Sequence, residues 1–313
     1  MSDTLFNRLA VIGIGLLGSS IAHAVKTYGG ADEIALFDGD PQARDLARRC
    51  VPGEVCDTLN EAVHDADLVI LCTPVGVFAD ITKAMAPHLK AGAVLSDVGS
   101  VKARAYEDMR AHCPDTAHLI PGHPIAGTEK SGPDAGFASL FKDAWHILTP
   151  EDNDDEAYQA SVARLGMFWN QLGAKVEIMD MARHDRVLAI TSHLPHLIAY
   201  NIVSTAYDME NVRDGEVVKY SAGGFRDFTR IAASDPTMWR DVFLANKAAV
   251  LETLGRFSED LAVLQRAIRW DDGDTLFREF SRARGIRKAI IDAGLDTAEA
   301  DFGRRAPEPS SET

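Results

Sequence analysis

Cysteine is scarce in this chain, which contains only four in 313 residues. Cys50, Cys56, Cys72 and Cys113 form no Cys-x-x-Cys pair and lie at no zinc-finger spacing from a histidine. The sequence therefore predicts no metal site and a reduced, cytoplasmic compartment.

Basic residues are also few, since 32 Lys and Arg stand against 47 Asp and Glu, a net charge of −15. Such a surface repels nucleic acids and anionic membranes, so neither is expected as a partner. A small anionic substrate would be repelled as well, and its binding would require a local cluster of Arg or Lys.

Uninterrupted apolar runs are missing too. The most apolar stretch, Leu9 to Val25, contains four Gly or Ser residues between positions 13 and 19 and lacks a basic segment before it. We interpret it as a buried strand followed by a glycine turn, and not as a signal peptide or a membrane span. The sequence shows no internal repeat.

The first 180 residues alternate short apolar runs with helix-like segments, the pattern of repeated βα units. The predicted strands are Leu9 to Ile14, Glu33 to Asp38, Asp67 to Thr73, Ala93 to Asp97, His118 to Pro121, Trp145 to Thr149 and Lys175 to Ile178. After Asp180 the pattern changes to helical periodicity. We therefore predict an α/β domain over residues 1–180, an all-α domain over 181–303 and a disordered tail over 304–313.

One long helix is expected in the second half of the chain. Its apolar residues recur at spacings that are sums of three and four: Trp239, Phe243, Val250, Leu254, Phe257, Leu261 and Leu264. Asp235 and Pro236 supply an N-cap and a first helical residue before this stripe. A dimer interface and a monomeric core both require such a stripe.

A glycine turn follows the first predicted strand and opens an apolar helix. Gly13, Gly15 and Gly18 permit a tight turn and close approach of a pyrophosphate, to which the helix N-terminus offers free N–H groups. Asp38 ends the second predicted strand, where a carboxylate binds a ribose 2′-hydroxyl and repels a 2′-phosphate. The pattern predicts a Rossmann-type domain that prefers NAD to NADP, although Arg44 could soften the preference. The predicted cofactor site also includes Leu16, Leu17, Thr73 and Pro74.

A single histidine, His123, lies among glycines just past a predicted strand. Loops at the carboxyl ends of parallel strands carry the ligand site, so His123 is expected to face the ligand. Alternatively, it only ties down the turn. Ser100 follows another predicted strand and should lie on the same rim, where its hydroxyl can position the imidazole, cap the next helix, or both.

The helical half offers further polar groups. His193 and His196 flank a proline that should bend an otherwise apolar helix, although a buried core histidine is the commoner explanation for either one. Arg226 and Arg230 follow two glycines, and an arginine there can hold a carboxylate by two parallel hydrogen bonds. Asp227 could pair with one arginine and leave the other available.

Together these segments resemble the prephenate and arogenate dehydrogenase family of tyrosine biosynthesis. The matching segments are Asp97 to Lys102, His123 to Glu129, His193 to His196 and Gly223 to Ala232, with Ser234, Asp235, Pro236 and Trp239. The resemblance runs from about residue 8 to residue 265 in the family's order. The segments around His123 and Arg230 are specific to the family.

The resemblance implies an oxidative decarboxylation, in which a hydride passes from a cyclohexadienyl ring to NAD and loss of the ring carboxylate makes the product aromatic. It implies that His123 takes the hydroxyl proton, Ser100 orients that hydroxyl and Arg230 anchors a substrate carboxylate. It also implies a homodimer and a pocket lined by His196, Thr128, Glu129 and Trp239, with Glu129 as a gate. The role of His193 and the choice between prephenate and arogenate stay open.

Two other functions stay open at this point. A dehydrogenase of the β-hydroxyacid type shares the two-part layout, but it usually relies on a lysine from the helical half, where this chain offers histidines and Arg230. A non-catalytic NAD sensor would keep the glycine turn and need neither His123 nor Arg230.

Overall fold

The computed structural model describes residues 4–128, 130–210 and 223–292. Contacts divide the chain into two compact units, with the boundary between residues 253 and 254, and each unit is described by itself. The predicted boundary near residue 180 is a different division and stays a prediction. The predicted disordered tail, residues 304–313, lies outside the described residues.

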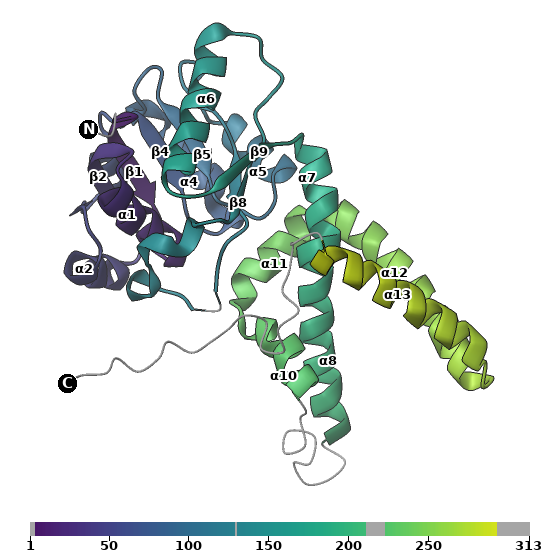
Figure 1. The fold of residues 1–313 in the computed structure, drawn as a ribbon. Helices are drawn as coiled ribbons and strands as arrows, with labels where there is room; N and C mark the ends of the chain where they lie inside the picture. The colour runs from purple at the N-terminus through teal and green to yellow at the C-terminus, as the bar shows by residue number, and fades with distance from the viewer. Residues whose placement is uncertain (1–3, 129, 211–222, 293–313) are drawn as a thin grey trace. The chain divides into compact units, whose positions relative to one another are not determined.

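Six of the described strands form a parallel sheet in the order β3-β2-β1-β4-β5-β6 (Figure 1). The strands are β1 (Phe6–Ile12), β2 (Ala31–Phe37), β3 (Glu54–Val55), β4 (Leu68–Leu71), β5 (Val94–Asp97) and β6 (His118–Leu119). Strand order reverses between β1 and β4, which opens a ligand crevice at the carboxyl ends of the strands. The predicted α/β class of the Rossmann type is confirmed.

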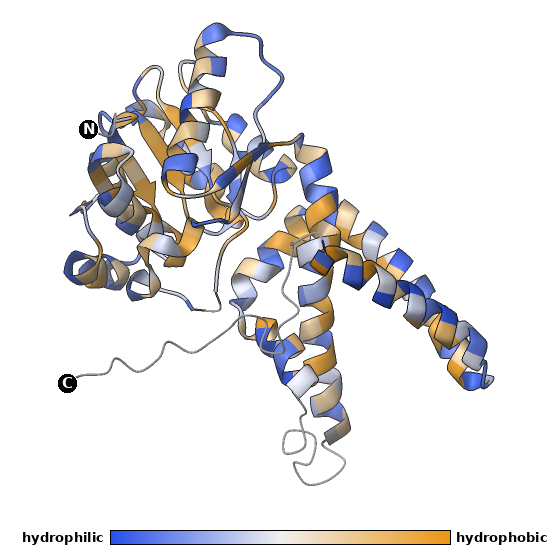
Figure 2. Cartoon of the chain, viewed as in Figure 1, coloured by the Kyte–Doolittle hydropathy of each residue, from blue (hydrophilic) through white to orange (hydrophobic). Residues whose placement is uncertain are grey.

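Helices cover both faces of this sheet. Alternate residues of β1 point to opposite faces, so each face presents apolar side chains that a layer of helices buries. Leu9 and Val11 join one apolar cluster with residues of α1 and α6, including Trp169. Ala10 and Ile12 join a second cluster with residues of α4 and α5. Figure 2 shows the apolar character of the sheet between them. The helices are α1 (Leu16–Tyr28), α2 (Pro41–Cys50), α3 (Leu59–Val63), α4 (Phe78–Met85), α5 (Ala103–Arg110) and α6 (Glu156–Gln171).

A second sheet of three described strands holds His123. It consists of β7 (Gly122–Pro124), β8 (Trp145–Leu148) and β9 (Lys175–Ile178), with β7 antiparallel to β8. His123 pairs with Ile147 in this sheet, so the expectation that it lies in a loop was wrong. The pairing partner comes from a distant part of the chain, and three residues are too few to show alternation. Short 3-10 helices connect the elements: η1 (Val75–Val77), η2 (Ala86–His88), η3 (Pro133–Ala135) and η4 (Ala138–Phe141).

The second half of the chain is helical, as predicted. Its elements are α7 (Met181–Leu188), the π-helical turn η5 (Ala189–His193), α8 (Leu194–Glu210), α10 (Gly223–Thr229), the 3-10 turn η6 (Arg230–Ala233), α11 (Pro236–Ala245), α12 (Lys247–Arg269) and α13 (Gly273–Asp292). The wide π turn ends two residues before Pro195, which lacks an N–H group and crowds the carbonyl of the preceding turn.

The single long helix expected from Trp239 onward was wrong, because the helix is interrupted at Asn246 between α11 and α12. The predicted start of α11 is confirmed, since Asp235 accepts a hydrogen bond from the Met238 amide at 2.8 Å and Pro236 is the first helical residue.

Candidate active site

The glycine turn after β1 fits a pyrophosphate. Gly13 has a φ of 101°, and a Cβ there would lie 2.7 Å from the carbonyl carbon of Cys72. A Cβ at Gly18 would lie 2.0 Å from the Gly13 oxygen, so helix and turn pack without side chains between them. Gly15 caps α1 without a side-chain bond, and a Cβ there would meet nothing within 4 Å. Leu16 and Leu17 therefore begin a helix whose N-terminus is open to an anion.

Asp38 is tied to this turn, just beyond β2. Its Oδ2 accepts the Ile14 amide at 2.8 Å and its Oδ1 accepts the Asp40 amide at 2.9 Å. Arg44 donates to the Asp38 carbonyl at 2.7 Å and lies over the Phe37 ring. The carboxylate thus lies beside the glycines, as the cofactor prediction requires.

Thr73 and Pro74 follow β4, on the other side of the strand-order reversal. Gly13 packs directly against the backbone at Cys72 and Thr73, which brings this segment to the glycine turn. Among the described residues, the buried Thr73 hydroxyl has no hydrogen-bond partner, and Pro74 is exposed. A polar bound molecule could satisfy that hydroxyl.

A buried ion pair links the ends of β5 and β7. The Lys102 ammonium contacts Asp97 at 2.5 Å and donates to the Gly122 carbonyl at 2.6 Å, and both charged side chains are fully buried. Asp97 also accepts the amides of Gly99 at 2.8 Å and Gly122 at 3.2 Å. Burial raises the pKa of Asp97 and lowers that of Lys102, while their mutual attraction opposes both shifts. The pair ties the turn that carries Ser100 to Gly122, the residue before His123.

His123 is buried and joined to two further polar side chains. Its Nδ1 lies 2.9 Å from His184 Nε2, and His184 Nδ1 lies 2.9 Å from Asp185 Oδ1. Burial lowers the pKa of His123 well below its ordinary value, and neighbouring His184 and Lys102 lower it further. His123 is therefore neutral at pH 7, the state in which an imidazole can accept a proton.

His193 belongs to the same polar cluster. Its Nδ1 lies 3.2 Å from the Asn246 amide nitrogen, which also donates to the Asp185 carbonyl at 2.8 Å. Burial lowers the pKa of His193 to about 4, against the opposing effects of Asp185 and the Ser100 backbone. These interactions account for His193 as a core residue, and they bring its ring next to Ser100.

His196, Trp239 and Arg230 form a second group on α8, α11 and η6. The His196 ring stacks on Trp239 with centroids 3.7 Å apart, and its Nδ1 donates to the Ser192 carbonyl at 2.9 Å. Burial lowers the pKa of His196, and the Arg230 guanidinium contributes to the shift. Arg230 is exposed.

Thr128 is exposed, and its hydroxyl accepts the Lys130 amide at 3.2 Å. The predicted contact between Thr128 and the substrate stays a prediction. Glu129, the predicted gate, lies outside the described residues.

Sequence reasoning gave no role to His184, Asp185 or Asn246, and it did not select His146. The pair His184 and Asp185 lies between two arginines, a pattern typical of a solvated helix, so no local signal marked it. His146 is fully buried on β8, stacks on Trp169 with centroids 3.8 Å apart, and has no hydrogen-bond partner within the described chain.

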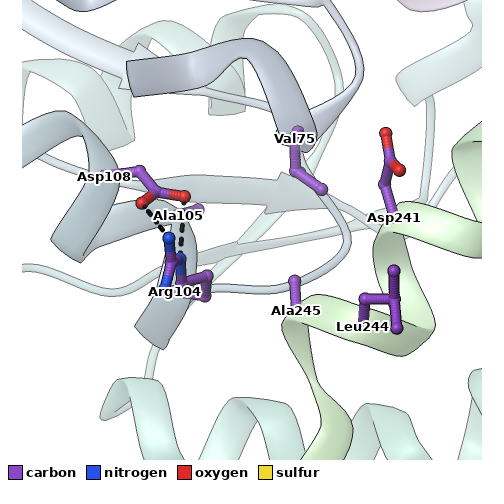
Figure 3. Close-up of a pocket in the computed structure, with 8 residues that line it drawn as sticks. Val75, Arg104, Ala105, Asp108, Asp241, Leu244 and Ala245 are labelled. Atoms are coloured by element: carbon purple, nitrogen blue, oxygen red, sulfur yellow. Dashed lines mark hydrogen bonds and ion pairs between the residues drawn. The ribbon is translucent and has the colours of Figure 1, made fainter. Parts of the chain in front are cut away.

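A surface cavity of about 270 Å³ opens between η1, α5 and α11 (Figure 3). Arg104 and Asp108 pair with each other on α5, while Asp241 and Leu244 line the opposite wall. None of the predicted site residues lines this cavity, so it does not belong to the candidate site.

The fold defines a class of protein: a nucleotide-binding domain with a parallel sheet, followed by a helical domain whose His184 bonds to His123. Two family models match the chain, the prephenate dehydrogenase nucleotide-binding domain over residues 21–178 and the prephenate dehydrogenase dimerization domain over residues 180–282. The chain therefore belongs to the prephenate dehydrogenase family, oxidoreductases of tyrosine biosynthesis.

Individual relatives agree with this assignment. The chain is 41% identical to the cyclohexadienyl dehydrogenase of Zymomonas mobilis, over 92% of this chain and 97% of that protein. The crystal structure of prephenate dehydrogenase from Aquifex aeolicus, in complex with hydroxyphenyl propionate and NAD⁺, has a TM-score of 0.79 and 32% identity, over 91% of this chain and 98% of that one.

The structure of Synechocystis arogenate dehydrogenase has a TM-score of 0.72 and 26% identity, over 90% of this chain and 99% of that one. The resemblance drawn from the sequence motifs is confirmed. Membership of this family excludes the alternative function of a β-hydroxyacid-type dehydrogenase.

Proposed function

We propose that the chain catalyses the NAD-dependent oxidative decarboxylation of prephenate, arogenate or both, with His123 as the general base. The observation that carries the proposal is a buried, neutral imidazole on β7, next to Gly122, whose amide bonds to Asp97 at the carboxyl end of β5 in the sheet that also carries the nucleotide turn. The names of the relatives support the substrate class, since they include prephenate, cyclohexadienyl and arogenate dehydrogenases.

Each residue of the candidate site has a role in the proposed oxidative decarboxylation. His123 takes the proton of the ring hydroxyl, which Ser100 orients, and the carbon that bears this hydroxyl would lose its hydride to bound NAD⁺. The ring then loses its carboxylate as CO₂, the bond electrons make the ring aromatic, and the new phenol oxygen regains a proton from His123. Arg230 holds a substrate carboxylate, and His196 with Trp239 forms the wall beside it.

NAD is the proposed cofactor, and bound NAD⁺ would supply the hydride acceptor. The open N-terminus of α1 suits a pyrophosphate, and the Asp38 carboxylate beside it suits a ribose hydroxyl and repels a 2′-phosphate. The NAD⁺ in the related Aquifex aeolicus crystal supports this choice.

We also propose a homodimer formed through the helical half, which the dimerization-domain match supports. The helical run Met181–Met209 is apolar and long enough by composition to cross a membrane, yet only 28% of its most apolar window is buried within the chain. Trp270 and Phe277 are 73% and 75% exposed. A second copy that covered such residues would gain apolar burial, and sedimentation analysis tests this.

The test is NADH formation by the purified protein, with prephenate and arogenate offered separately. His123→Asn should lower kcat by about 100- to 10,000-fold and leave the Kd for NAD unchanged, because a general base contributes that much to rate. His64→Asn is the matched control, since the His64 side chain is 74% exposed. Unchanged kcat in His123→Asn would remove it as the base. NAD binding without turnover of either substrate would favour the sensor.

A further inference from the structure

We infer that His184 and Asp185 are positioning residues that fix the tautomer of His123, so that its Nε2 carries the reactive lone pair. The inference rests on the proposed function in taking His123 as the base, and it adds which ring nitrogen acts. It follows from a continuous series of hydrogen bonds that runs from a buried carboxylate through one imidazole to the next.

The series begins at Asp185, which the backbone of another element holds in place. Its Oδ1 accepts the Lys102 amide at 2.8 Å, and its Oδ2 accepts the Ala103 amide at 3.0 Å, both at the start of α5. Burial raises the pKa of Asp185, but hydrogen bonds from His184 and these two amides outweigh it and bring the pKa below its ordinary value. An ionised carboxylate only accepts hydrogen bonds.

The direction of the next two bonds follows. In its 2.9 Å contact with Asp185, His184 must donate from Nδ1. Burial lowers the pKa of His184, so the ring is neutral at pH 7 and its Nε2 carries a lone pair. His123 Nδ1, 2.9 Å from that lone pair, must then donate, which leaves His123 Nε2 without a hydrogen.

Other charged and titratable groups also face the two rings. Lys102, paired with Asp97, lowers the pKa of both His123 and His184. His146 on β8 and His193 on η5 face His123 as well, and burial lowers the pKa of each. These groups keep the resting His123 neutral, whereas the Asp185 carboxylate, acting through His184, stabilises the positive charge that the His123 ring gains when it takes a proton.

Nitrogen-15 NMR of protein labelled at histidine tests the assignment directly, without turnover. The His123 signals are identified by their loss in His123→Asn. We expect a protonated Nδ1 and a bare Nε2 for His123 at pH 7, and a protonated Nδ1 for His184. A hydrogen on His123 Nε2 in the wild-type protein would overturn the inference, whatever the activity.

Steady-state kinetics of Asp185→Asn provides a second test. The new side-chain amide can donate to His184 and so reverse the direction of both hydrogen bonds. We expect kcat to fall on the order of 100-fold or more, with KM and the Kd for NAD within threefold, and a changed His123 tautomer in the spectrum. Asp180→Ala is the control, because Asp180 caps the same helix by accepting the Arg183 amide at 2.8 Å and lies outside the series. It should keep kcat within twofold.

His184→Phe provides a second variant that keeps a ring and removes both hydrogen bonds, and it should also lose kcat with little change in KM. Retention of kcat within threefold in either variant would overturn the inference. A wild-type enzyme that turns over neither substrate would refute the proposed function instead, and the nitrogen spectrum would still decide the tautomer.

Discussion

Replacing Lys102 with methionine removes the only charge that directly pairs with the Asp97 carboxylate among the described residues. Both side chains are fully buried, and breaking such a pair leaves an uncompensated charge at a cost of about 3–5 kcal/mol. Asp97 keeps its bonds from the Gly99 and Gly122 amides, which places the expected loss near the lower end, about 3 kcal/mol.

The loss should depend on pH with a defined sign. Burial already raises the pKa of Asp97 above its ordinary value, and removal of the ammonium raises it further. A group whose pKa is raised in the folded state contributes stability at low pH that disappears as pH rises through that pKa. The deficit of Lys102→Met relative to wild type should therefore be larger at pH 8 than at pH 5.

Urea unfolding followed by tryptophan fluorescence at both pH values measures this deficit. Lys83→Met, at an exposed position on α4, is the control and should change stability by less than about 0.5 kcal/mol. Adding Asp97→Asn to Lys102→Met should restore more than about 1 kcal/mol at pH 8, because a neutral amide needs no counter-charge. A stability deficit of Lys102→Met below about 1 kcal/mol at both pH values would refute the reasoning, and so would a deficit that is larger at pH 5 than at pH 8.

Two further predictions concern the substrate anchor and acid stability. Arg230→Gln should raise KM about 30-fold, equivalent to about 2 kcal/mol, with kcat within threefold, while Arg226→Gln on α10 should leave KM within twofold; steady-state kinetics that show the reverse would make Arg226 the anchor. The free energy of unfolding should fall by more than about 2 kcal/mol from pH 7 to pH 5, because burial depresses the pKa of His123, His146 and His193 and the unfolded chain binds those protons near pH 6.5. A flat urea-unfolding profile over that range would contradict this.

The sequence predicted the parts of the fold that depend on local signals. Seven strands were predicted within about three residues of their observed ends, because most of them are short apolar runs between turn residues. The glycine turn and the N-cap at Asp235 were also predicted, since both follow from backbone geometry at one or two positions. The short strands β3 and β7 were missed because no apolar run marks their two and three residues.

The break at Asn246 shows why an apolar stripe can mislead. The stripe continues across it, but the Asn246 amide donates to the Asp185 carbonyl and approaches His193, both distant in sequence. Such contacts exist only after the two segments meet. The same reason hid His184 and Asp185, whose partners are His123 and the start of α5.

The segment from Asp97 to Ala103 braces the candidate site from both ends. At one end Asp97 and Lys102 hold Gly122, the residue next to His123, and at the other the amides of Lys102 and Ala103 hold Asp185. Ser100 lies between these two anchors, so its position is fixed relative to both His123, the proposed base, and the hydrogen bonds that join His123 to Asp185. A seven-residue turn thereby couples β5, β7 and α7, three elements that are far apart in the chain.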